Sequence, residues 1–127
     1  MLTAEKILKS QDIHEPEKVD VPEWGDHVYV RVMNGIERDR FELMVSKGMD
    51  KPSTANIRAA LCVMTICDQS GKRLFTDNQA AHLGAKNSVA LDRIFDVAQK
   101  INKLKQEDMD ELEKNSVTAL KEVSGST

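Results

Sequence analysis

An apolar run near the middle of the chain constrains the fold most strongly. Between Ile57 and Cys67 only two polar residues interrupt a continuous series of apolar ones. A helix that starts at Ser53 or Thr54 and includes this run would be apolar on most of its sides, which is typical of the buried centre of a domain. A strand over 61–67 is the alternative, because short apolar runs do not distinguish a buried helix from a buried strand.

The chain length is compatible with one domain built around this run. A chain of 127 residues buries roughly two-thirds of the surface that it exposes when unfolded, so it can form a core without disulfides or metal. The core must be mainly aliphatic, because the chain contains only five aromatic residues: Trp24, Tyr29, Phe41, Phe75 and Phe95. We expect one domain over 1–115 and a flexible C-terminal tail over 116–127, where Ser, Thr and Gly accumulate.

Alternating valines before this run predict a β-hairpin. Val28, Val30 and Val32 alternate with other residues in the period-2 pattern of a half-buried strand, and a shorter alternation precedes them. The sequence therefore predicts strands over 18–22 and 27–33, joined by a turn that contains a glycine. An isolated hairpin is marginally stable in water, so its valine face must pack against helices.

Capping residues and helical periodicity predict helices on both sides of the apolar run. Asn34 and Glu37 have the spacing of a capping box, as do Thr76 and Gln79. In the first of these helices we expect Ile36, Arg40, Phe41, Met44 and Val45 to share the packed face. The expected helices are 3–9 with Thr3 as its cap, 34–47 ending near Gly48, 53–66, 76–84, 88–104 capped by Asn87 or Ser88, and 106–114.

These elements define an α+β fold that is mainly α, with a small N-terminal β-hairpin packed against four or five helices. The first apolar residues are interrupted by Lys6 and Lys9, so no signal peptide is expected. No stretch approaches the roughly 20 apolar residues that a membrane span requires. We therefore expect a cytosolic protein without a membrane partner.

The sequence offers no constellation of residues that indicates catalysis. No pair among the three histidines and two cysteines has metal-ligand spacing: His14, His27, His82, Cys62 and Cys67. The carboxylate pair Asp92 and Asp96 lies on a helix that also carries basic residues, which is typical of a solvated surface. The glycines are scattered and form no phosphate-binding loop. We expect a non-enzymatic protein with no catalytic residue, no cofactor-binding residue, no metal ligand and no cofactor.

A helix-turn-helix DNA-binding regulator is one alternative function. Residues 79–86 and the helix that follows have the outline of that motif. The motif would place Ala90 and Arg93 in the packed face, whereas the strong hydrophobic residues are Leu91 and Ile94, one position later. That shift rotates the second helix by about 100°. We therefore favour an ordinary helical hairpin and expect no nucleic-acid partner.

The charge distribution indicates a possible mode of self-association. Residues 1–26 and residues 106–127 each have a net charge of −4, whereas residues 27–60 carry +2 and residues 61–105 carry +3. Such a layout is typical of solvated helix faces. It also permits the acidic end of one copy to contact the basic middle of another.

An ordered set of short motifs resembles a known family. The set includes Val21-Pro22-Glu23-Trp24-Gly25, Gly35-Ile36-Glu37-Arg38-Asp39-Arg40-Phe41-Glu42, Asp68-Gln69-Ser70-Gly71-Lys72-Arg73-Leu74-Phe75, Leu83-Gly84-Ala85-Lys86-Asn87 and Leu91-Asp92-Arg93-Ile94-Phe95-Asp96. This order is similar to that of the tail assembly chaperones of long-tailed bacteriophages of the lambda and HK97 kind, over about residues 1–115. The chain departs from the pattern at Lys105, where the family has a Ser-type cap at the start of the last helix.

The resemblance implies a non-enzymatic chaperone that acts in the host cytoplasm. It would bind the tape measure protein, keep it soluble, recruit tail tube subunits and be absent from the mature virion. It would be the shorter of two forms that ribosomal frameshifting produces. Five methionines could adapt to a helical partner, although an ordinary core position is favoured for each: Met33, Met44, Met49, Met64 and Met109. A small host adaptor protein is a further alternative.

Overall fold

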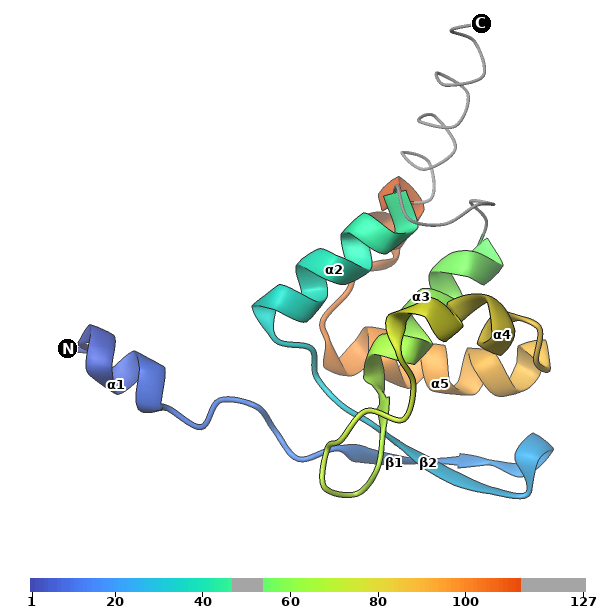
Figure 1. Ribbon diagram of the computed structural model, residues 1–127, viewed down its shortest axis with the longest axis horizontal. Helices are drawn as coiled ribbons and strands as arrows, with labels where there is room; N and C mark the ends of the chain where they lie inside the picture. The colour runs from blue at the N-terminus through green and yellow to red at the C-terminus, as the bar shows by residue number, and fades with distance from the viewer. Residues whose placement is uncertain (47–53, 113–127) are drawn as a thin grey trace, which may run out of the picture.

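A computed structural model describes residues 1–46 and 54–112 of the chain and has the predicted α+β, mainly α architecture (Figure 1). Helix α3, Thr54–Thr65, occupies its centre, and every side chain from Ala59 to Thr65 is buried. Residues Ile66–Cys67 then form strand β3. Both interpretations of 61–67 are thus correct in part: the run is helical as far as Thr65 and extended afterwards.

The sheet has three antiparallel strands in the order β1-β2-β3. The predicted hairpin is formed by β1, Glu17–Val21, and β2, Asp26–Val30. The short helix η1, Pro22–Trp24, joins them, and Gly25 then has a φ of 75°, which glycine adopts without strain. The valine face packs against the helices as expected, since three valines lie in the core: Val19, Val21 and Val30.

Helix α2, Gly35–Ser46, begins with the predicted capping box. The backbone N–H of Asn34 donates to Glu37 Oε1 (3.0 Å), and the N–H of Glu37 donates to Asn34 Oδ1 (2.8 Å). The prediction of its packed face was wrong in part, because Ile36 is 72% exposed and Arg40 is also exposed. Glu37 takes the inward position one turn before the buried Phe41. The predicted end of this helix at 47–48 lies outside the described residues.

A short helical segment connects the sheet to the second half of the molecule. It consists of η2, Asp77–Gln79, and α4, Ala80–Gly84. The predicted capping box is present, with the backbone N–H of Thr76 donating to Gln79 Oε1 (2.8 Å). Gly84 brings α4 close to α3, because a Cβ atom at this position would lie 3.3 Å from Ala59 Cβ. Glycine therefore permits the close approach of these two helices.

Helix α5, Ser88–Ile101, packs against both α3 and the hairpin. The Asn87 side chain caps it, as predicted, by accepting from the N–H groups of Val89 (2.9 Å) and Ala90 (3.0 Å). Its buried residues follow the helical period: Ala90, Leu91, Ile94 and Ala98.

The prediction that this helix continues to 104 was wrong. Lys103 has a φ of 54°, and the N–H of Leu104 donates to the Gln99 carbonyl (2.9 Å) while the N–H of Lys103 donates to the Lys100 carbonyl (3.1 Å). This pair of hydrogen bonds is a Schellman motif, which ends helices with a left-handed residue that is usually glycine. Leu104 is buried as expected, but from the loop after the helix.

Replacing Lys103 with glycine should stabilise the fold. A left-handed conformation costs a residue with a Cβ atom about 1–2 kcal/mol, and glycine avoids this cost. Glycine also loses more conformational entropy on folding than lysine does. We therefore expect a net gain of about 1 kcal/mol in the free energy of unfolding. Urea denaturation measures the change. The matched control is Lys100→Gly, inside the helix, which should lose about 1 kcal/mol. A destabilised Lys103→Gly protein would contradict this account of the helix end.

The two ends of the described chain differ in their packing. Helix α1, Ala4–Lys9, is capped by Thr3 as predicted, but it buries no residue and lies apart from the body (Figure 1). A last helix begins at residue 106, as expected, and anchors Met109 in the core. At Lys105, where the chain departs from the family pattern, the backbone N–H donates to Asp108 Oδ2 (3.3 Å). The predicted tail, 116–127, lies outside the described residues.

Among the helices that the structure describes, none is both long and apolar enough to cross a membrane.

Candidate functional site

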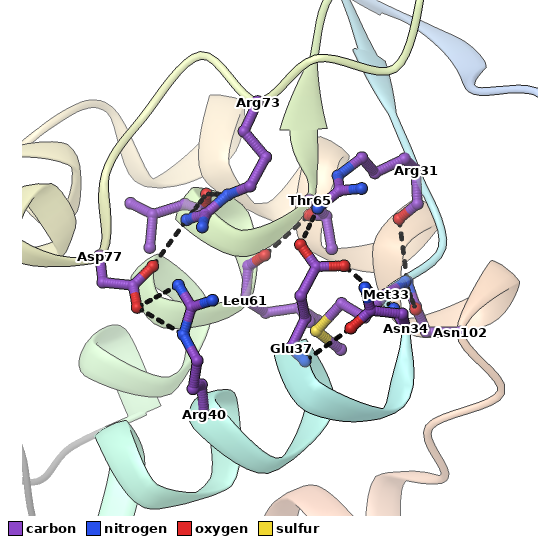
Figure 2. A network of polar contacts seen from close by, with 11 residues as sticks. Arg31, Met33, Asn34, Glu37, Arg40, Leu61, Thr65, Arg73, Asp77 and Asn102 are labelled. Carbon is purple, nitrogen blue, oxygen red and sulfur yellow. Dashed lines mark hydrogen bonds and ion pairs between the residues drawn. The ribbon is translucent and has the colours of Figure 1, made fainter. Parts of the chain in front are cut away.

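A polar network lies where β2 leads into α2 (Figure 2). The carboxylate of Glu37 accepts from the guanidinium of Arg31 in addition to its bond with the Asn34 backbone. Both partners of this ion pair are largely withdrawn from solvent, with side chains 9% and 16% exposed. Glu37 therefore both caps α2 and neutralises a largely buried cation from the sheet.

Asn102 connects the end of α5 to the same region. Its side-chain oxygen accepts from the backbone N–H of Met33 (2.7 Å), and its amide donates to the carbonyls of Arg31 (3.3 Å) and Ala98 (2.8 Å). One side chain thereby satisfies backbone groups of two segments about 70 residues apart in the chain. The amide fixes the β2–α2 connection against the end of α5.

A second ion-pair cluster joins α2 to the start of η2 and to Arg73, which precedes it. Arg40 Nε donates to Asp77 Oδ2 (3.0 Å), and Arg73 Nη2 lies 2.9 Å from Asp77 Oδ1. Arg73 also donates to the carbonyl of Val63 (2.8 Å). Burial alone would raise the pKa of Asp77, but the hydrogen bonds from the two arginines hold that pKa below its ordinary value. Asp77 is thus kept ionised between two cations.

The surroundings of Arg31 disfavour its charged form. Burial lowers the pKa of its guanidinium below the ordinary value, and the positive charge of Arg73 lowers it further. Its Nε atom is buried, and no group in the described part of the chain accepts a hydrogen bond from it. Arg31 is therefore paired with Glu37, but one of its N–H groups lacks a hydrogen-bond acceptor in the described residues.

Two open hollows meet at this cluster. One has a volume of about 550 Å³, and its charged lining consists of Arg31, Arg40, Lys72, Arg73 and Asp77. The other, of about 570 Å³, lies between residues 13–16, the strand β2 and the turn at 69–71. Arg31 and Gly71 line both hollows. The combined surface is concave and mainly basic on the side of α2.

Several exposed apolar side chains lie on or beside two helices, α1 and α2. On α2, Ile36 and Leu43 are 72% and 55% exposed, and their seven-residue separation places them on one side of the helix. On and beside α1, Leu2, Ile7 and Leu8 are exposed as well. These helices could contact an apolar helix of a partner, whereas the sequence pattern had assigned Ile36 to the core.

The structure places the cysteines and histidines that were weighed as metal ligands on different elements of the fold. Cys62 lies on α3 and Cys67 on β3. Burial raises the pKa of the Cys62 thiol to about 12 and also raises that of Cys67, which disfavours the nucleophilic thiolate form. His27 pairs with Asp26 (2.9 Å), and His14 and His82 are exposed. No cluster of three or more His, Cys, Asp or Glu residues able to hold a metal ion occurs within 1–46 and 54–112.

The methionines lie mainly in the core. Met33, Met64 and Met109 are buried, and Met44 packs against the core from a partly exposed position. Met49 lies outside the described residues. The core interpretation of these three is confirmed, so an adaptable methionine surface is not available from them.

The helical hairpin of α4 and α5 differs from a DNA-reading arrangement. Arg93, which the motif would place in the packed face, is at the surface and pairs with Glu23 (2.5 Å). Asp92 of the same helix pairs with Arg58 of α3 (3.0 Å). The exposed side of α5 is therefore engaged in intramolecular ion pairs and includes carboxylates, which repel phosphate.

Local sequence signals predicted the capping bond of Glu37 but not its ion pair with Arg31 or the bridging role of Asn102. Alternation in the second predicted strand places Arg31 on the face of the sheet opposite the valines, but it does not indicate a partner for Arg31. Asn102 carried no sequence signal, because its main partners are backbone groups distant in sequence.

Comparison with known proteins identifies the family. No curated protein and no solved structure matches the chain. The sequence model of a family described as phage tail assembly chaperone does match, over residues 3–115. This range includes the hairpin, the central helix and both ion-pair clusters, and agrees with the resemblance of the ordered motifs. Because the match covers most of its length, the chain belongs to the phage tail assembly chaperone family.

Proposed function

We propose that this protein is a non-enzymatic chaperone that binds the tape measure protein in the host cytoplasm and keeps it soluble. It then recruits tail tube subunits and leaves before the virion is mature. Family membership supports a role in tail assembly. The observation that carries the finer proposal is the outward-facing apolar pair on α2, Ile36 and Leu43.

A long helical client requires a surface that accepts one apolar helix face. Ile36 and Leu43 are two helical turns apart, about 10 Å along α2, which matches the repeat of an amphipathic helix that docks in an apolar groove. Helix α1 is a second helix with exposed apolar side chains. Six residues are too few for a stable isolated helix, so contact with a partner would stabilise α1 and cover its apolar side chains.

Co-expression with the tape measure protein tests this proposal. The wild-type chain should keep the tape measure protein soluble and co-purify with it. Each aliphatic side chain buried in the contact contributes about 1.5–3 kcal/mol, so Ile36→Ser combined with Leu43→Ser should weaken binding by about 100-fold or more. Quantitative pull-down from the soluble fraction measures the loss.

The matched control is Leu74→Ser combined with Val89→Ser, which removes two apolar side chains of similar exposure from other surfaces. This control should bind like the wild type. Equal loss in both double variants would show that general surface hydrophobicity, and not α2, holds the client. A wild-type chain that neither solubilises nor co-purifies with the tape measure protein would refute the proposed function.

A further inference from the structure

The linker between α1 and β1 passes beside the first turn of α2. Asp12 and His14 line a hollow of about 320 Å³ together with Gly35, the first residue of α2. In the described part of the chain, no hydrogen bond or ion pair joins residues 11–16 to any other residue. The linker therefore holds α1 close to α2 without fixing the direction in which α1 points.

The linker is long enough for α1 to reach the apolar pair on α2. Lys9, the last residue of α1, precedes Asp12 by three residues, which span up to about 10 Å when extended. Ile36 follows Gly35 directly. Because α1 is tethered at its C-terminal end, it would lie antiparallel to α2, and its six residues would extend about 9 Å. This length matches the separation of about 10 Å between Ile36 and Leu43 along α2.

Helix α1 has an apolar side that suits this contact. Ala4, Ile7 and Leu8 have the spacing of three and four residues that places them on one side of a helix. Ile7 and Leu8 are exposed, and α1 buries no residue in the open arrangement of Figure 1. In the antiparallel arrangement Leu8 would contact Ile36, and Ala4 would lie toward Leu43. Each helix would thus cover the exposed apolar side chains of the other.

We infer that α1 folds back onto α2 in the free chain and covers Ile36 and Leu43 until a client displaces it. Six residues do not form a stable helix alone, and α2 is an apolar surface within reach of the linker. A segment on a short tether has an effective concentration in the millimolar range, so even a weak contact is populated. The contact itself needs no client, whereas its regulatory role rests on the proposed function.

Closure of α1 would set the apparent affinity of α2 for its client. When only about one tenth of the molecules are open, the apparent Kd is about tenfold higher than the Kd of the open state. The closed form would also hide an exposed apolar surface, which is a liability for aggregation, while no client is present. One contact would then both protect the free chain and limit binding to clients that can displace α1.

Methyl NMR of the purified chain tests the contact in the absence of a client. Nuclear Overhauser effects should link the methyl groups of Leu8 and Ile36. In an equal mixture of two differently labelled preparations, no such effect should join one copy to another, because the contact lies within a single chain. Absence of the effect, or its presence only between copies, would overturn the inference.

Substitutions on α1 identify the side that makes the contact. Ile7→Ser combined with Leu8→Ser should shift the methyl resonances of Ile36. The matched control is Glu5→Gln combined with Lys9→Gln, which removes the exposed ion pair of α1 at constant net charge. This control should leave the Ile36 resonances unchanged. Equal shifts in both double variants would mean that the apolar side of α1 has no special role.

Calorimetry with a synthetic amphipathic segment of the tape measure protein tests the regulatory role. Ile7→Ser combined with Leu8→Ser should bind this segment about tenfold more tightly than the wild type, since α1 no longer competes for α2. Weaker binding would mean that α1 itself holds the client, which would overturn the regulatory role. If neither protein binds the segment while the NMR contact is present, the proposed function fails and the intramolecular contact stands.

A disulfide can lock α1 in the closed position. Leu8→Cys combined with Ile36→Cys should form this bond under mild oxidation, and both native cysteines are buried and so react slowly. The oxidised variant should lose client binding, and reduction of the same sample should restore it. The matched control, Leu8→Cys combined with Val89→Cys on α5, should form no bond within the chain. A locked chain that binds its client as well as the reduced one would refute the assignment of α2 as the surface that α1 covers.

Discussion

Replacing Glu37 with alanine should lower the free energy of unfolding by about 3–5 kcal/mol, because removal of one member of a buried ion pair leaves the other charge without a partner. Arg31 would lose its only carboxylate contact in the described residues, and the N–H of Asn34 would lose its acceptor. Urea denaturation followed by circular dichroism measures the change in the free energy of unfolding. The expected loss is a large fraction of the total stability of a typical domain.

The matched control for Glu37 is Glu42→Ala on the same helix. Glu42 pairs with Arg38 at 3.0 Å, but both side chains are more than a third exposed, and such pairs contribute about 0.3–0.5 kcal/mol. Equal losses in the two variants would show that the buried pair has no special role. Replacing the pair together, as Arg31→Met with Glu37→Leu, should restore most of the stability, since apolar residues of similar volume often replace a buried ion pair without loss.

Sequence patterns predicted the elements that depend on near neighbours. The two capping boxes, the cap at Asn87 and the valine alternation each involve residues within a few positions of one another, so the local chain contains the whole signal. The central helix was predictable for a related reason. A segment that is apolar on most sides must be buried, whichever neighbours cover it.

The errors arose where a distant partner decides the outcome. Ile36 was expected to pack and is exposed, whereas Glu37, which pairs with the cation of Arg31, is the inward residue of α2. The end of α5 was missed because Lys103 occupies a left-handed position that glycine usually marks. Neither the ion pair between Arg31 and Glu37 nor the hydrogen bonds of Asn102 follow from periodicity.

The candidate interaction surfaces were likewise predictable from the sequence only in part. The charge layout along the sequence predicted a basic middle and acidic ends, and the structure places members of that middle around one hollow. The apolar pair on α2 was predictable only in part, because Leu43 had been left out of the packed face whereas Ile36 had been assigned to it. Exposure of Ile36 is therefore information that only the fold supplies.

Phe41→Ala should produce a loss as large as that of Glu37→Ala, about 3–5 kcal/mol, since truncation of a buried aromatic side chain removes its transfer free energy and leaves a cavity. Phe41 is the only fully buried aromatic residue in the described chain, so no other ring can fill that space. The chain has few aromatic residues, and the surrounding core is made of compact aliphatic side chains that cannot collapse far.

Thermal and urea denaturation of Phe41→Ala and Leu43→Ala give the decisive comparison. The two positions lie on the same helix, but Leu43 is 55% exposed, and its truncation should change the stability by no more than about 0.5 kcal/mol. Phe41→Leu, which keeps most of the volume, should fall between them. A Phe41→Ala protein as stable as Leu43→Ala would mean that α2 does not pack against α3 through this ring. The assignment of the opposite side of α2 as a client-binding surface would then also fail, because that surface exists only if Phe41 holds the helix in its observed rotation.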